Sequence, residues 1–232
     1  MRQEIYKWLD IMSAIEKFVI NDIILEIPET LLVPEIREAM EQGYYEIEEL
    51  SSLRHLIRAG DRVLELGGGI GFISTFAIKY LHASHVCSVE ANEILIPVIQ
   101  QNHKLNNVYG EVLHGLASID DGYSDFHRTD AFWASSSHNI SNSVKSRVLS
   151  INTSKLMDRV RPDVLIVDIE GGEEFIFQGL VIPDCVRSIM CEIHPAIIGG
   201  HGIISCFESL HQIGFSYDVK GSSGAIVAFD RK

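Results

Sequence analysis

The sequence predicts an α/β fold in which helices cover both faces of a mostly parallel sheet. Apolar segments of strand length alternate with amphipathic helical segments from residue 61 onward, and a glycine-rich turn joins the first of these strands to its helix. The last two predicted strands are separated only by residues 220–223. So short a connection makes a hairpin, and we therefore expect the final strand to run antiparallel to its neighbour.

The chain before this sheet is expected to be largely helical. Apolar residues recur at helical spacing over residues 1–20, which predicts a helix with one apolar stripe. A short strand is expected at residues 23–27, where Pro28 stops it. A helix then begins at Pro34, a residue type favoured in the first turn, and ends at Gly43, and another reaches about residue 59.

The sheet is expected to contain seven strands with helices between most of them. The strands are predicted at residues 61–66, 84–90, 110–116, 163–169, 187–193, 214–219 and 224–230. The helices are predicted at residues 70–81, 92–106, 172–180 and 200–213, with a weaker one at residues 153–160.

Neither a linker nor a repeat divides the chain, so we interpret it as a helical N-terminal extension, residues 1–42, followed by one domain, residues 43–232. Residues 120–147 are polar and rich in serine. A loop this long inside a compact domain is usually functional or disordered. Because it leaves the carboxyl end of the third strand, we expect a substrate-facing flap with Trp133 as one wall, or else a mobile surface insertion.

Charge and cysteine usage restrict the partners. The chain carries 19 basic and 32 acidic residues, a net charge of −13, which disfavours nucleic acid and anionic membranes as partners. We find no apolar run long enough to span a bilayer and no apolar leader segment. The four cysteines show neither a C-x-x-C pair nor zinc-ligand spacing, so a cytoplasmic location is expected.

The glycine-rich turn after the first sheet strand predicts a nucleotide-like cofactor. Glycine lets a ligand approach the backbone closely, and the amides that open the next helix point at that ligand. A dinucleotide loop has the pattern G-x-G-x-x-G, whereas Gly67, Gly69 and Gly71 follow G-x-G-x-G, with Gly68 between the first two. Glu65 precedes the turn, and its carboxylate suits a cationic ligand better than a pyrophosphate.

This arrangement resembles the first motif of class I S-adenosylmethionine (SAM) methyltransferases, in which the acid faces the amino group of the methionine moiety. A second acid, Glu90, ends the next strand 23 residues after Gly67. That is close to the roughly 20-residue interval expected for an acid that binds ribose hydroxyls. Ala91 and Asn92 follow, where the adenine pocket of such enzymes begins. A nicotinamide-dependent oxidoreductase is the alternative, disfavoured by the glycine spacing.

Two later strands end in ionisable residues. Asp168 and Glu170 end one strand, and Glu192 and His194 end the next, so neighbouring tips should bring all four together beside the methyl group of SAM. His194 is our first candidate for a general base, because its unperturbed pKa lies near neutrality, with Glu170 or Glu192 orienting it. Asp168 is the alternative base, or it faces the cofactor.

Two further interpretations of these four residues stay open. Three carboxylates and one imidazole could bind Mg²⁺ or a similar hard cation, which would orient an acceptor oxygen and lower its pKa. In the other interpretation, His194 has a purely structural role.

Several segments together resemble the FkbM family of SAM-dependent methyltransferases. They are Tyr45-Glu46, the loop of residues 65–71, residues 89–92, 102–107, 151–156, 168–173 with Gly179, and 192–195. The resemblance covers about residues 43–232. It implies a Rossmann-like, seven-stranded class I methyltransferase sheet and SAM as cofactor. It also implies O-methylation of a hydroxyl on a saccharide or natural-product acceptor.

The chain departs from that family's pattern at Glu65, where aspartate is commoner, and at Gly68, where alanine often occurs. We expect Tyr45 and Glu46 to close over the methionine end of SAM, and Leu116 and Ala117 to line the adenine. A non-catalytic SAM-binding module is a further alternative, and the apolar stripe of residues 1–20 could serve an oligomer interface.

Overall fold

The computed structural model describes residues 14–128 and 144–231, and the site is built on its seven-stranded sheet. The strand order is β11-β12-β10-β9-β3-β4-β5. These strands span Phe215–Tyr217 (β11), Ile226–Arg231 (β12), Ser188–Glu192 (β10), Val164–Val167 (β9), Arg62–Leu66 (β3), His85–Glu90 (β4) and Glu111–His114 (β5). The five strands from β10 to β5 are parallel, and β12 is antiparallel to both of its neighbours. The seven strands and the closing hairpin are confirmed.

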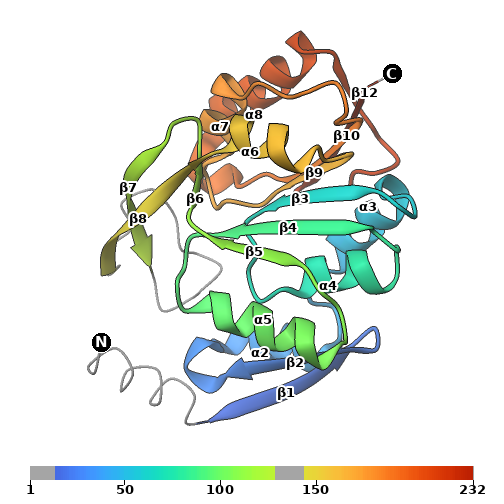
Figure 1. The fold of residues 1–232 in the computed structure, drawn as a ribbon, viewed down its shortest axis with the longest axis vertical. Helices are drawn as coiled ribbons and strands as arrows, with labels where there is room; N and C mark the ends of the chain where they lie inside the picture. The colour runs from blue at the N-terminus through green and yellow to red at the C-terminus, as the bar shows by residue number, and fades with distance from the viewer. Residues whose placement is uncertain (1–13, 129–143, 232) are drawn as a thin grey trace.

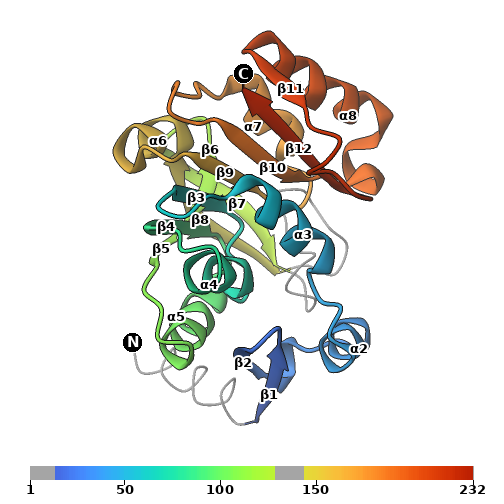
Figure 2. The same ribbon diagram turned by 90° about the vertical axis from the view of Figure 1, so that its right-hand side faces the viewer.

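Helices cover both faces of this sheet, as Figures 1 and 2 show. One face carries α3 (Ile47–Leu56), α4 (Phe72–Lys79) and α5 (Leu95–Leu105), and the other carries α6 (Thr153–Val160), α7 (Glu173–Gly179) and α8 (Pro195–Gln212). Two hydrophobic clusters follow from the strand alternation: Val63 packs with the first set of helices, and Leu64 and Leu66 pack with the second. The α8 helix is interrupted at Gly199, whose φ of 64° and ψ of 179° are not helical, so the part after Gly199 matches the predicted helix and a short segment that begins at Pro195 precedes it.

The N-terminal segment differs from the prediction. Residues 15–20, expected to be helical, form β1 (Ile15–Ile20), which pairs with β2 (Ile23–Pro28) as an antiparallel hairpin. Asn21 and Asp22 both have positive φ, the two-residue turn that suits such a hairpin, and Asn-Asp adopts it readily. Phe18 and Ile20 are buried while Val19 between them is exposed, so the period is two. Residues 1–13 lie outside the described residues.

The hairpin packs on the side of the domain that carries α3, α4 and α5. Its apolar residues belong to the cluster that contains residues of α3, α4 and α5. The side chain of Asn102 on α5 accepts a hydrogen bond from the backbone of the hairpin, and that of Asn106, the C-cap residue of α5, both accepts one from it and donates one to it. A one-turn 3-10 helix (Glu29–Leu31) and α2 (Pro34–Gln42) follow, and Gly43 ends α2 in the left-handed conformation, as predicted.

Part of the predicted flap is a second sheet. Strands β6 (Leu116–Ser118), β7 (Gly122–Arg128) and β8 (Val144–Asn152) are arranged in the order β6-β8-β7 beside the end of β5 (Figure 1). The prediction of a loop is therefore wrong for residues 122–128 and 144–147. Phe126 and Val148 are buried in an otherwise polar ribbon, so its apolar pattern is weak. Trp133 lies outside the described residues.

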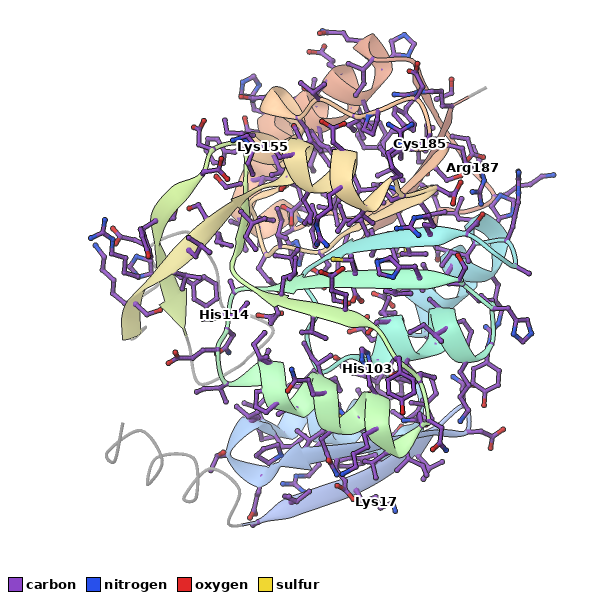
Figure 3. All side chains as sticks on the ribbon, in the orientation of Figure 1. Lys17, His103, His114, Lys155, Cys185 and Arg187 are labelled. Atoms are coloured by element: carbon purple, nitrogen blue, oxygen red, sulfur yellow. The ribbon has the colours of Figure 1, made fainter. Side chains whose placement is uncertain are left out.

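Figure 3 shows His103 on α5, which contrasts with the histidine of the candidate site. Its ring is 4% exposed and lies 2.9 Å from the hydroxyl of Ser74 on α4. Burial lowers the pKa of His103 to about 4, so the ring is neutral and ties two helices together. Among the described residues, no helix has the length and apolarity needed to cross a bilayer.

Candidate active site

The glycine turn leaves room on one side only. A Cβ at Gly67 would lie 1.7 Å from the carbonyl oxygen of Asp168, because the turn is packed against the end of β9. At Gly69, which has a φ of +50°, a Cβ would meet nothing within 4 Å. The turn is therefore tight against the sheet and open toward the cleft beside it, which suits a ligand lying over the backbone. Gly68 packs on Ile99, and Gly71 is the N-cap of α4.

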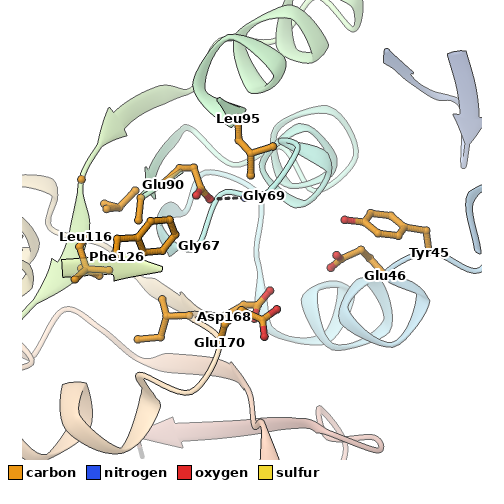
Figure 4. Close-up of a pocket in the computed structure, with 15 residues that line it drawn as sticks. Tyr45, Glu46, Gly67, Gly69, Glu90, Leu95, Leu116, Phe126, Asp168 and Glu170 are labelled. Carbon is orange, nitrogen blue, oxygen red and sulfur yellow. Dashed lines mark hydrogen bonds between the residues drawn. The ribbon is translucent and has the colours of Figure 1, made fainter. Parts of the chain in front are cut away.

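Glu90 at the end of β4 holds this turn in place. Its Oε2 accepts a hydrogen bond from the amide of Gly69 at 2.9 Å (Figure 4). Its Oε1 accepts one from the amide of Asn92 at 2.7 Å. Burial raises the pKa of Glu90 to about 7, and these amides oppose that rise. A carboxylate is an acceptor with two oxygens, the kind of group that ribose hydroxyls can donate to.

Glu65 lies on β3, on the face covered by α3, α4 and α5. Its side chain is 1% exposed, and the hydroxyl of Ser88 on β4 donates a hydrogen bond to it. Burial raises the pKa of Glu65 to about 8, although the bond from Ser88 opposes that rise. A cationic group brought to this carboxyl would favour its charged form.

An open cleft lies beside the turn and holds about 650 Å³ of empty space, including the part that is open to solvent. Figure 4 shows Tyr45 and Glu46 on one side of it and Leu116 on the opposite side. The predicted site residues that line it are Tyr45, Glu46, Gly67, Gly69, Glu90, Ala91, Leu116, Ala117, Asp168 and Glu170. Asn92 does not line this cleft: it is 2% exposed, and its side-chain oxygen accepts from the amide of Ile94.

Sequence reasoning missed four lining residues: Val89, Leu95, Phe126 and Ile169. Phe126 is the most consequential, because its ring is 4% exposed and belongs to β7, within the segment predicted as a loop. A signal was present in the alternation around Phe126, where polar residues flank one aromatic.

A second cleft of about 400 Å³ adjoins the first. The two share Tyr45, Glu46, Gly67, Gly69 and Asp168. The second cleft also reaches Glu49, Glu65, Gly68 and Glu192. Among the described residues that line the two clefts there is no lysine or arginine, so the combined space is strongly acidic.

His194 joins four carboxylates at the edge of the clefts. Its Nε2 lies 3.2 Å from Glu170, 3.7 Å from Asp168 and 3.9 Å from Glu192. Its Nδ1 lies 3.0 Å from Oε1 of Glu173. Strands β9 and β10 are adjacent and parallel, so the predicted meeting of these tips is observed. Glu173 was not among the predicted site residues, although it follows Asp168 and Glu170 in the same motif.

The charges of this cluster alter the pKa values of its members. Burial opposes a proton on His194, but the hydrogen bond to Glu173 and the charges of Glu170 and Glu192 outweigh it and raise the pKa to about 9. Burial raises the pKa of Glu170 to about 7 and that of Asp168 well above its usual value. The choice of His194 as base rested on its unperturbed pKa near neutrality, and these carboxylates shift that pKa upward, which favours the protonated ring in the ligand-free protein.

Three of these residues are close enough to hold one divalent cation. Asp168, Glu192 and His194 each offer one ligand atom, and these atoms lie within 4.8 Å of one another. Oδ1 of Asp168 is buried and has no hydrogen-bond partner within the described part of the chain.

Residues 65–214 match the methyltransferase FkbM domain, which is more than half of the chain. The chain belongs to the FkbM methyltransferase family. A curated relative, the ribosomal protein L11 methyltransferase of Halalkalibacterium halodurans, is 34% identical over 64 residues. That match covers 28% of this chain and 20% of the relative, so the chain spans about a fifth of the length of this relative.

Two solved structures share the fold at low identity. Precorrin-6y C5,15-methyltransferase from Geobacter metallireducens has a TM-score of 0.51 and 14% identity, covering 82% of this chain and 88% of that one. Trm5b from Pyrococcus abyssi has a TM-score of 0.50 and 14% identity, covering 93% of this chain and 54% of that one. The predicted Rossmann-like methyltransferase sheet is therefore confirmed.

Proposed function

We propose that this protein is a SAM-dependent methyltransferase that methylates a hydroxyl on a neutral or cationic acceptor, such as a saccharide or natural-product scaffold. The observation that carries the proposal is the glycine turn at Gly69, open to a cleft lined by Glu90 and by Glu170, whose carboxylate lies 3.2 Å from Nε2 of His194. Membership of the FkbM family supports methyl transfer, and the geometry supports the assignment of roles.

The residues of the two clefts fit the parts of SAM. Leu116, Ala117 and Phe126 offer an apolar slot for adenine, and Glu90 offers carboxylate oxygens to the ribose hydroxyls. Glu65 lines the second cleft, where its carboxylate suits the ammonium of the methionine part. Tyr45 and Glu46 line both clefts and would cover that part. When bound, SAM supplies an electrophilic methyl group on a sulfonium.

His194 would take the proton of the acceptor hydroxyl at Nε2. The ring must be neutral for this, and a nearby cationic sulfonium lowers the pKa of His194 from about 9 toward neutrality. Asp168 is the alternative base, because its raised pKa makes it a better proton acceptor than an ordinary aspartate.

The charge of the site restricts the acceptor. Glu46, Glu49 and Glu192 line the clefts, with no lysine or arginine among the described lining residues. A phosphorylated acceptor would meet repulsion from these carboxylates, with no lysine or arginine among the described lining residues to offset it. We therefore propose a neutral or amine-bearing acceptor rather than a nucleic acid.

Methyl transfer from labelled SAM tests the proposal. We expect product from a panel of saccharides and hydroxylated natural products, and none from nucleic acid. His194→Ala should lower kcat by about 100- to 10,000-fold, the usual contribution of a general base, while the affinity for S-adenosylhomocysteine is retained. SAM binding without any methylated product across the panel would instead favour a non-catalytic SAM-binding module.

A second candidate mechanism uses a divalent cation held by Asp168, Glu192 and His194. The 4.8 Å spacing of their ligand atoms and the unpartnered Oδ1 of Asp168 favour it. Such a cation would lower the pKa of the acceptor hydroxyl. Turnover abolished by EDTA and restored by Mg²⁺ or Mn²⁺ would support this mechanism, and turnover that is indifferent to EDTA would exclude it.

A further inference from the structure

Glu173 is a fully buried carboxylate in contact with the candidate base. It is the first residue of α7 and its side chain is 0% exposed. Its Oε1 accepts a hydrogen bond from the amide of Gly171 at 3.1 Å and lies 3.0 Å from Nδ1 of His194, 21 residues away. Its Oε2 is also buried and has no hydrogen-bond partner among the residues that the structure describes.

The stabilisation of α7 by an acid in its first turn does not by itself explain why Glu173 is buried. An acid in the first turn favours the positive end of the helix dipole, but an exposed acid achieves that equally well. Glu174 occupies the next position of the same turn and is only partly buried. Burying a carboxylate costs free energy unless a partner compensates it. The thiols of Cys191 and Cys206 also lie near Glu173. Burial raises their pKa values, so both thiols stay neutral, and a thiol has no positively charged form that could compensate the carboxylate.

The position of Glu173 fixes what the two ring nitrogens of His194 can do. A carboxylate beside Nδ1 accepts a hydrogen bond from it, so Nδ1 carries a proton in either charge state. The other nitrogen, Nε2, then faces Glu170, Asp168 and Glu192 at the cleft. His194 is also the N-cap residue of α8, yet its side chain makes no capping hydrogen bond, so the helix does not set the ring.

We propose that Glu173 is a positioning residue, whose carboxylate holds Nδ1–H of His194 and thereby presents Nε2 to the acceptor. The inference rests on the proposed role of His194. It also holds if Nε2 binds a cation, since carboxylate–histidine pairs orient ring ligands in the same way.

Nitrogen-15 NMR of the imidazole rings tests the contact without any need for activity. His194→Asn identifies the signal of His194 among the histidines. In EDTA-treated wild-type protein, at a pH where the ring is neutral, we expect the proton on Nδ1. In Glu173→Gln, whose neutral amide accepts that proton more weakly than a carboxylate and can instead donate to Nδ1, we expect a shift of population to the Nε2-protonated form. Glu174→Gln, the matched control on the same turn, should keep the wild-type signal.

Kinetics test the consequence. Glu173→Gln should lower kcat by at least about tenfold, as the loss of an orienting carboxylate does elsewhere, with an unchanged affinity for S-adenosylhomocysteine. Should Glu173→Gln fail to fold, Glu173→Asp serves instead, since it keeps the charge but is one methylene too short for the contact.

The outcomes separate this inference from the proposed function. A wild-type tautomer in the Glu173 variants, or a wild-type kcat with only a lower Tm, would overturn the positioning role. A tautomer change in a protein that methylates no acceptor would leave the contact established and refute the proposed reaction instead.

Discussion

Gly67 and Gly69 lie in the same turn, but adding a methyl side chain would have a different effect at each position. A Cβ at Gly67 would lie 1.7 Å from the carbonyl oxygen of Asp168, whereas a Cβ at Gly69 would meet nothing. We expect Gly67→Ala to destabilise the protein by more than about 3 kcal/mol, because backbone atoms of β3 and β9 must separate. Urea unfolding measures this change.

Gly69→Ala is the matched control for that effect. Its positive φ costs about 1–2 kcal/mol in a residue with a Cβ, and no clash adds to this. Its new methyl group would enter the cleft, so we expect weaker SAM binding with a smaller loss of stability. Equal stabilities of the two variants would contradict the described geometry of the turn.

Several ionisable residues of the site predict how stability changes with pH. The pKa of Glu65 is raised to about 8, that of Glu90 to about 7 and that of Glu170 to about 7, so each binds its proton more tightly when folded. The raised pKa of His194, about 9, acts in the same direction. The stabilisation from His194 is complete below its unfolded pKa of about 6.5 and is lost as the pH rises through about 9.

The carboxyls add a penalty that begins above their unfolded pKa of about 4.3 and is complete above about pH 8. We therefore expect the free energy of unfolding of the ligand-free protein to fall between about pH 5 and pH 9. Urea unfolding across this range measures the slope, which Glu170→Gln should flatten. A free energy that rises with pH would contradict the burial of these charges.

Residue spacing predicted most of the candidate site, including Glu65, Glu90, Asp168 and His194, because glycines and acids at strand ends follow regular intervals. It did not predict Phe126 or Glu173. A lone aromatic in a polar ribbon and an acid in a first helical turn have common structural explanations, and only their three-dimensional contacts distinguish them.

At the scale of the element, strand β7 contributes one wall of the cofactor cleft through Phe126. If the ring packs on adenine, Phe126→Ala should weaken SAM and S-adenosylhomocysteine alike by about 1–3 kcal/mol, the usual value of base–aromatic stacking. Calorimetric titration measures both affinities. Tyr123→Ala is the control on the same strand, since Tyr123 is 63% exposed. Wild-type affinities in the Phe126 variant would contradict this placement of adenine.

Helix α5 connects the N-terminal hairpin with the glycine turn through hydrogen bonds of one side chain. The side chain of Asn102 accepts from the amide of Glu26 at 2.8 Å and donates to the carbonyl of Ile70 at 2.9 Å. Asn102→Leu leaves both groups buried without partners, so we expect a loss of about 1–3 kcal/mol for each. Urea unfolding measures it, with the exposed Lys104→Ala as control. Equal stabilities would show that the hairpin does not depend on α5.

The N-terminal elements explain why helix prediction failed at residues 15–20. The segment Ile-Glu-Lys-Phe-Val-Ile contains apolar residues at both periods, and the preceding apolar stripe favoured a helix. The pairing with β2 and the turn at Asn21 and Asp22 decided the outcome, and both depend on contacts beyond the segment itself. The buried apolar segments of strands β3 and β9 were predicted correctly as strands.

At the scale of the whole molecule, the strand order places β3, which leads into the glycine turn, between β9 and β4. Asp168 follows β9, and Glu90 ends β4. The sheet could be predicted because seven apolar segments alternate with helices and end in a short hairpin. The second sheet could not, because its strands are largely polar and bury only a few side chains, among them Phe126 and Val148. We retain as a proposal the division into an extension of residues 1–42 and a SAM-binding domain of residues 43–232.

Titration calorimetry with purified protein tests the central claim most directly. We predict that SAM and S-adenosylhomocysteine each bind with one site per chain, that Glu90→Gln weakens both, and that NAD⁺ does not bind. Binding of NAD⁺ with no detectable heat from SAM or S-adenosylhomocysteine would contradict the account.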